Sequence, residues 1–132
     1  MLYNKAWDKP AANINDPVSL LLRAAEIIEE VGLAKGHFII EDGHYGQPIG
    51  AMCIQGAVIA AAGLQVDVST ARDVINSRPE LTTAVRMFGE AIPESFYSGH
   101  EDKFGHAISF NNNYTVSQQD VVATARRAAL AA

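Results

Sequence analysis

Cys53 is the only cysteine of the sequence, and it lies where the chain enters a long apolar stretch. If that stretch is a helix, its N-terminus lowers the pKa of the thiol by stabilising the thiolate. Cys53 is followed along the chain by His106 and then by Asn111 or Asn112, which is the order of nucleophile, base and orienting residue in one class of cysteine hydrolases. One interpretation is therefore a cysteine-dependent hydrolase that uses Cys53, His106 and Asn112.

The residues around Cys53 favour packing instead. Met52 and Ile54 flank it, and Gly56 and Ala57 follow in the next turn, so only the helix end itself would stabilise a thiolate. A lone cysteine in such surroundings is most often a small buried hydrophobic side chain. We therefore favour no catalytic residue, and the hydrolase remains the alternative.

The histidines and glycines do not predict a metal or cofactor site. No close His-x-x-x-His pair occurs among the four histidines, which are His37, His44, His100 and His106. The glycines between residues 43 and 50 are not followed by Lys-Ser or Lys-Thr, as a phosphate-binding loop requires. We expect neither a metal nor a cofactor.

Aromatic residues in segments with weak regular structure are the candidates for partner binding. Such residues either pin loops or contact another protein, and here they are Trp7, Phe96, Tyr97 and Phe104. Residues 111–113, three consecutive asparagines, are expected to end a strand and form a turn, with ligand binding as the alternative.

Composition limits the classes of protein that the chain can belong to. It has 132 residues, of which 48% are hydrophobic and 19% charged, as in a globular domain. Its net charge of -5 opposes binding to nucleic acid. A single cysteine favours a reducing compartment, and the longest apolar stretch, residues 54–64, is too short to span a bilayer. We expect a soluble cytoplasmic protein without membrane contact.

Helix signals dominate the chain after residue 15. Asp16, Pro17 and Gly32 suit the two ends of a first helix, and the apolar segment from Cys53 to about Gly63 predicts a central one. Three more helices are expected over residues 70–77, from 79 to a point before Pro93, and 115–130, the last with Thr115 and Gln118 as a capping box. The predicted inner face of the fourth helix consists of Leu81, Val85, Phe88 and Ile92.

Short β-like segments complete the predicted fold. Residues 36–40 and 47–49 flank a turn-rich stretch and suggest a small hairpin, and residues 106–110 alternate as a strand does. We therefore predict a mainly helical α+β domain over residues 16–132, with about five helices around the central one and a small antiparallel sheet. Residues 1–15 are predicted to be an arm that contacts its own domain or a second copy, which makes a homodimer possible.

Two separated stretches of the sequence carry a family resemblance. The first is Leu-Arg-Ala-Ala-Glu-Ile-Ile-Glu-Glu-Val-Gly at residues 22–32, and the second is Cys-Ile-Gln-Gly-Ala-Val-Ile-Ala-Ala-Ala at 53–62. Both resemble a small uncharacterised family from actinobacteria and their phages. The second half is similar more loosely, through Phe110-Asn111-Asn112 and the helix that follows. Leu33 replaces a tryptophan of the family pattern, and Asn112 replaces an aspartate. The resemblance implies a shared fold and a phage or actinobacterial origin, without a mechanism.

From these observations we expect a small intracellular interaction or regulatory protein with a protein partner, for example a phage factor that binds a host component. The acidic charge and the absence of a cofactor pattern in the sequence favour this class over the hydrolase.

Overall fold

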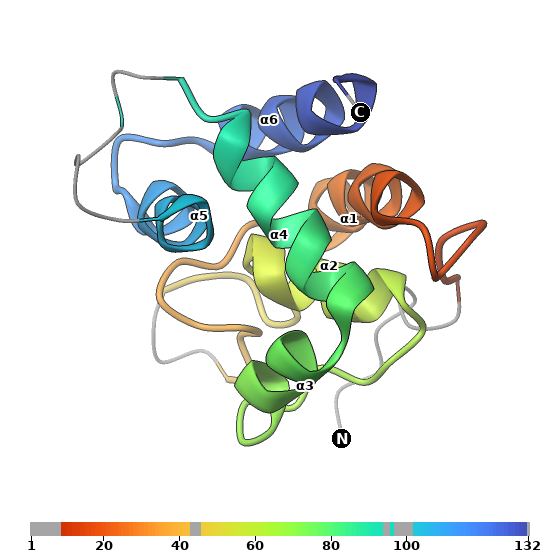
Figure 1. Ribbon diagram of the computed structural model, residues 1–132. Coiled ribbons are helices and arrows are strands. Elements are labelled where there is room, and N and C mark those ends of the chain that lie inside the picture. The colour runs from red at the N-terminus through yellow and green to blue at the C-terminus, as the bar shows by residue number, and fades with distance from the viewer. Residues whose placement is uncertain (1–8, 43–45, 94–95, 97–101, 132) are drawn as a thin grey trace.

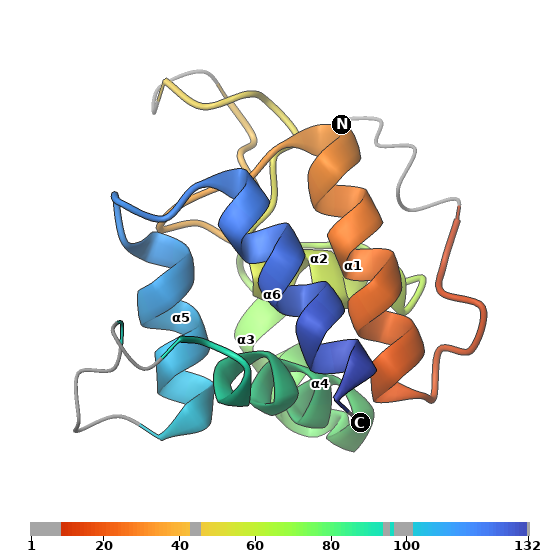
Figure 2. The ribbon, with the colours of Figure 1, turned by 90° about the horizontal axis from the view of Figure 1, so that it is seen from above.

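The computed structural model describes residues 9–42, 46–93, 96 and 102–131, and its regular structure is helical. The helices in this part of the chain are α1 (Pro17–Val31), α2 (Ile54–Ala61), α3 (Ala71–Ser77), α4 (Pro79–Glu90), α5 (Lys103–Asn112) and α6 (Gln118–Leu130). α1 and α6 lie side by side, and α2 is in the middle, in contact with α1, α3, α4 and α5 (Figure 1 and Figure 2). None of these helices is both long and apolar enough to cross a membrane.

α1 begins and ends where the sequence predicts. The Asp16 carboxylate accepts a hydrogen bond from the N–H of Val18 at 3.1 Å, and Pro17 occupies the first helical position. The helix ends at Gly32, whose φ of 96° is in the region that favours glycine. These local signals fix the two ends of α1. The helix between them packs its buried residues against α2 and α6.

α2 confirms the prediction of a central apolar helix, since every one of its residues is buried. Its close packing depends on Gly56. A Cβ atom at this position would lie 2.1 Å from the carbonyl oxygen of Phe38, so only glycine allows the helix to approach that segment so closely.

α3 and α4 are also confirmed. Pro79 occupies the first turn of α4, as the sequence indicates, whereas Thr70 precedes α3 without a capping hydrogen bond from its side chain. The whole predicted inner face is buried, namely Leu81, Val85, Phe88 and Ile92. α4 contacts α1, α2, α5 and α6, and Phe88 of this face packs against Phe110 of α5, with ring centroids 6.0 Å apart.

The predicted α+β class is wrong, because the described residues contain no strand and no sheet. Residues 106–110, predicted as a strand, belong to α5, a helix that was not among those predicted from the sequence. Asp102 caps this helix by accepting a hydrogen bond from the N–H of Gly105 at 2.7 Å. The apolar residues that alternate on a strand are here sorted by helical spacing, with Ala107 and Phe110 buried and Ile108 partly exposed.

The predicted hairpin between residues 36 and 49 does not form a sheet either. Isolated bridges join Leu33 to Met52 in parallel and Ile39 to Met52 in antiparallel orientation. Each bridge joins a single pair of residues, so the segments at Leu33 and Ile39 pass next to Met52 without forming strands. The extended segment still has a role, because it forms one wall of the cleft described below.

α6 starts later than predicted. The capping box consists of Ser117 and Asp120 instead of Thr115 and Gln118. The N–H of Asp120 donates to Ser117 Oγ at 3.1 Å, and the N–H of Ser117 donates to Asp120 Oδ2 at 2.9 Å. Thr115 belongs to the turn before the helix, where its N–H donates to Asn113 Oδ1 at 2.9 Å.

Residues 9–15, the described part of the predicted arm, lie against the helices. The N–H of Ala11 donates to the carbonyl of Ala61 at 2.7 Å, and Arg23 Nε on α1 donates to the carbonyl of Lys9 at 2.6 Å. Ala11 is buried in the core. This segment therefore contacts its own domain at the middle of α1 and at the C-terminal end of α2.

Candidate functional site

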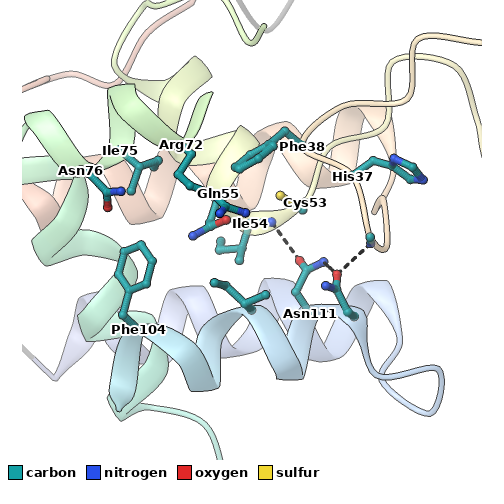
Figure 3. Close-up of a pocket in the computed structure, with 13 residues that line it drawn as sticks. His37, Phe38, Cys53, Ile54, Gln55, Arg72, Ile75, Asn76, Phe104 and Asn111 are labelled. Carbon is teal, nitrogen blue, oxygen red and sulfur yellow. Dashed lines mark hydrogen bonds between the residues drawn. The ribbon is translucent and has the colours of Figure 1, made fainter. Parts of the chain in front are cut away.

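A cleft with a volume of about 420 Å³ lies between α3, α5 and the start of α2 (Figure 3). The extended segment at residues 36–38 closes one side. Its lining comprises Gly36, His37, Phe38, Cys53, Ile54, Gln55, Arg72, Ile75, Asn76, Phe104, Ile108, Asn111 and Asn112. The volume falls within the usual range of sites for small ligands.

The cleft is apolar in its walls and polar at a few points. Phe38, Ile54, Ile75, Phe104 and Ile108 provide the apolar surface. The other lining side chains are mainly amides, together with one arginine, one histidine and the Cys53 thiol, and no carboxylate from the described part of the chain lines the cleft. Such a mixture suits a ligand with an apolar body and a polar end.

Cys53 caps α2. Its Sγ accepts a hydrogen bond from the N–H of Gly56 at 3.3 Å, and only 8% of the residue is exposed. Burial raises the pKa of the thiol to about 11, because the loss of water outweighs the hydrogen bonds from backbone N–H groups that favour the thiolate. The thiol therefore stays protonated near neutral pH, which supports packing and opposes nucleophilic chemistry.

His106 lies on another side of α5. Phe104 and Ile108 are four residues apart and both line the cleft, whereas His106 lies between them, about 200° around the helix from Phe104. It is buried and is not part of the lining. Of the three residues of the hydrolase alternative, the cleft brings together Cys53 and Asn112 but not His106.

Asn111 joins α5 to the start of α2. Its Oδ1 accepts a hydrogen bond from the N–H of Ile54 at 2.8 Å, and its Nδ2 donates to the carbonyl of Ala34 at 2.9 Å. Asn112 Oδ1 accepts from the N–H of Gly36 at 2.8 Å. These asparagines were expected to end a strand, but they hold the walls of the cleft together, as the dashed lines in Figure 3 show.

The structure describes two of the four aromatic residues proposed for partner binding. Phe104 lines the cleft and points into it (Figure 3). Phe96 packs edge-on against Phe110, with ring centroids 5.0 Å apart, which fits a loop pinned to α5. Trp7 and Tyr97 lie outside the described residues.

Residues 13–131 match the model of a family of unknown function, DUF6197. The chain belongs to the DUF6197 family. This match confirms that the resemblance seen in the sequence is to a family whose function is unknown. No curated protein and no solved structure matches the chain.

Three polar residues of the DUF6197 cleft were missed in the sequence. Gln55 interrupts the apolar run of α2 and is 8% exposed, while Arg72 and Asn76 lie four residues apart on one face of α3. A single polar residue in a wholly apolar helix is a usable signal for Gln55. Arg72 and Asn76 carry no comparable signal, because exposed polar residues are normal on a short helix.

Metal binding has no candidate within the described part of this DUF6197 chain, where no three His, Cys, Asp or Glu side chains come together. Two N–H groups at the α2 N-terminus, those of Ile54 and Gly56, are already bonded within the protein. Asn111 accepts from Ile54 and the thiol of Cys53 accepts from Gly56. The ligand-binding capacity of the cleft therefore resides in its side chains.

Proposed function

We propose that this DUF6197 protein acts by binding another protein, and that the partner enters the cleft between α3 and α5. The observation that carries this proposal is the cleft itself, with apolar walls and a polar edge. Aromatic and arginine side chains are the types that contribute most to protein interfaces, and here Phe104 and Arg72 are both part of the lining. Ile108 lines the cleft and is 39% exposed, so it offers apolar surface that a side chain of the partner can cover.

Two features support binding rather than catalysis. The pKa of the Cys53 thiol is about 11, which leaves it without nucleophilic character at neutral pH. The remaining polar residues of the lining are mainly amides, with one arginine and one histidine, His37, and none of the described residues adds a carboxylate there; amides and arginine are suited to recognition.

The sequence indicates which class of partner to search for. The resemblance to proteins of actinobacteria and their phages directs the search to proteins of an actinobacterial host, within its cytoplasm. The net charge of -5 argues against nucleic acid as the partner. A second copy of this chain is the other protein to test.

The test compares two variants for capture of a partner from host lysate, followed by binding of the purified partner. Ile108→Arg places a long charged side chain in the cleft at a partly exposed position, so folding is preserved. Tyr114→Arg is the matched control, because Tyr114 is 91% exposed and does not line the cleft. We expect the partner to bind the wild type and Tyr114→Arg equally, and Ile108→Arg at least about tenfold more weakly.

Two results would oppose the proposal. Equal binding of the purified partner to all three proteins would exclude the cleft as its site. If no partner is captured and light scattering shows a monomer for the wild type, interaction with a protein is not the function.

A further inference from the structure

Gln55 presents its side-chain amide to the cleft. The residue is only 8% exposed, and it lines the cleft next to the start of α2. An amide in this position can donate a hydrogen bond to a ligand in place of water.

Arg72 is an exposed cation on the same cleft. Three arginines elsewhere, Arg23, Arg78 and Arg126, form ion pairs with glutamates. No ion pair is formed by Arg72 with any residue that the structure describes. Figure 3 shows its side chain extending from α3 toward Gln55, with Asn76 further along the same helix.

The charges of the lining limit the ligand to a weak anion. Arg72 is the one lysine or arginine among the described residues of the lining, and none of these residues is an Asp or a Glu. The N–H groups of Ile54 and Gly56 at the start of α2 are already bonded within the protein. One guanidinium balances a carboxylate, whereas a phosphate with two charges would need more donors than remain.

We propose that the cleft binds the C-terminal residue of the partner, with its carboxylate at Arg72 and Gln55 and its apolar side chain against Phe104 and Ile108. This proposal rests on the proposed function. A cleft of about 420 Å³ suits the end of a chain better than a continuous helix or strand. A terminal residue also brings the apolar group and the carboxylate together, which is an established way to recognise chain ends.

The experiment uses a minimal probe, the peptide acetyl-Gly-Leu-Phe, with either a free C-terminal carboxylate or a C-terminal amide. Binding to the ¹⁵N-labelled full chain is followed by NMR, through the side-chain amide signals of Gln55 and the backbone signals around the cleft. We expect the free acid to shift these signals and to bind about tenfold or more tightly than the amide, because hydrogen bonds to charged groups are the stronger ones.

Paired arginine variants test the site of the carboxylate. Arg72→Gln removes the charge at the cleft and should weaken binding of the free acid about tenfold, without weakening binding of the amide. Arg86→Gln removes the same charge from an exposed position on α4 that does not line the cleft, and should leave both affinities unchanged.

The outcomes separate this proposal from the proposed function. Equal binding of acid and amide in the cleft, or an unchanged affinity of the acid for Arg72→Gln, overturns carboxylate recognition and leaves binding of a partner in place. Binding of 4-phenylbutyrate without binding of either peptide identifies a free organic acid as the ligand and overturns the protein partner. Failure of both peptides and of 4-phenylbutyrate to shift any signal of the cleft overturns the proposal directly.

Discussion

Substitution of Gly56 by alanine tests the packing that supports the cleft. The new Cβ would lie 2.1 Å from the carbonyl oxygen of Phe38, whereas ordinary contacts start at 3.4 Å, so the two must separate by about 1.3 Å. The same oxygen accepts a hydrogen bond from the N–H of Cys53 at 3.3 Å. Moving Phe38 therefore strains this hydrogen bond and displaces one wall of the cleft.

The expected free-energy change combines opposing terms. Overpacking in a closely packed core destabilises by about 1–3 kcal/mol, and loss of the Phe38–Cys53 hydrogen bond adds about 1 kcal/mol. Alanine is a better helix former than glycine by about 1 kcal/mol, which offsets part of this change. Gly56→Ala should therefore lower the free energy of unfolding by about 1–3 kcal/mol.

The assay is urea denaturation of the wild type and Gly56→Ala, monitored by circular dichroism. NMR on the same proteins should show large shifts of the Phe38 and Cys53 amides. The sign of the stability change tests the close approach of Gly56 to Phe38. A protein gains stability when a helical glycine with free space around it is replaced by alanine. An equal or greater free energy of unfolding for Gly56→Ala would refute the close approach at Phe38.

Three further predictions concern a thiol, an amide and a guanidinium. Because the pKa of Cys53 is raised to about 11 from an ordinary 9.0, the protonated thiol stabilises the fold below pH 9, and this contribution is lost as pH rises toward 11. Urea denaturation should show the wild type losing on the order of 2 kcal/mol more than Cys53→Ala over this interval, and equal losses would contradict the burial of the thiol. Asn111→Ala leaves the N–H of Ile54 without its partner and should lower the free energy of unfolding by about 2–4 kcal/mol, whereas an unchanged denaturation midpoint would show that the bridge is dispensable. Arg23→Met removes the donor to the Lys9 carbonyl and should speed hydrogen exchange at Ala11, and unchanged protection there would mean that other contacts hold the segment.

Helices with strong local signals could be predicted from the sequence. Asp16 and Pro17 start α1, Gly32 ends it, and Pro79 starts α4, each through an effect that involves neighbouring residues only. The central place of α2 followed from its lack of a polar face, because such a helix must be covered on all sides.

α5 could not be distinguished from a strand by its local sequence. Ile108 and Phe110 on either side of a serine satisfy the alternation of a strand, and Gly105 weakens the helix signal. The helix is nevertheless marked by Asp102 as its cap and by apolar residues at helical spacing, Phe104 and Ile108 among them. Packing against α4 decides between two patterns that the local sequence leaves nearly equal.

The cleft was predicted only in parts. Cys53, Phe104 and Asn112 were singled out for their chemistry or their aromatic character, and all of them line it. Gln55 and Arg72 were not, because their roles depend on which helices lie opposite them. No spacing within one segment carries that information.

The cleft is assembled from four stretches of chain, at residues 36–38, 53–55, 72–76 and 104–112. The unfolded chain has no such site, so any ligand of the cleft binds only the folded protein and must raise its melting temperature by mass action. At a ligand concentration about a hundred times the Kd, the added stability is about 2.7 kcal/mol. Thermal stability is thus a direct measure of occupancy for this protein, and a library of compounds or peptides can be screened before any activity is known.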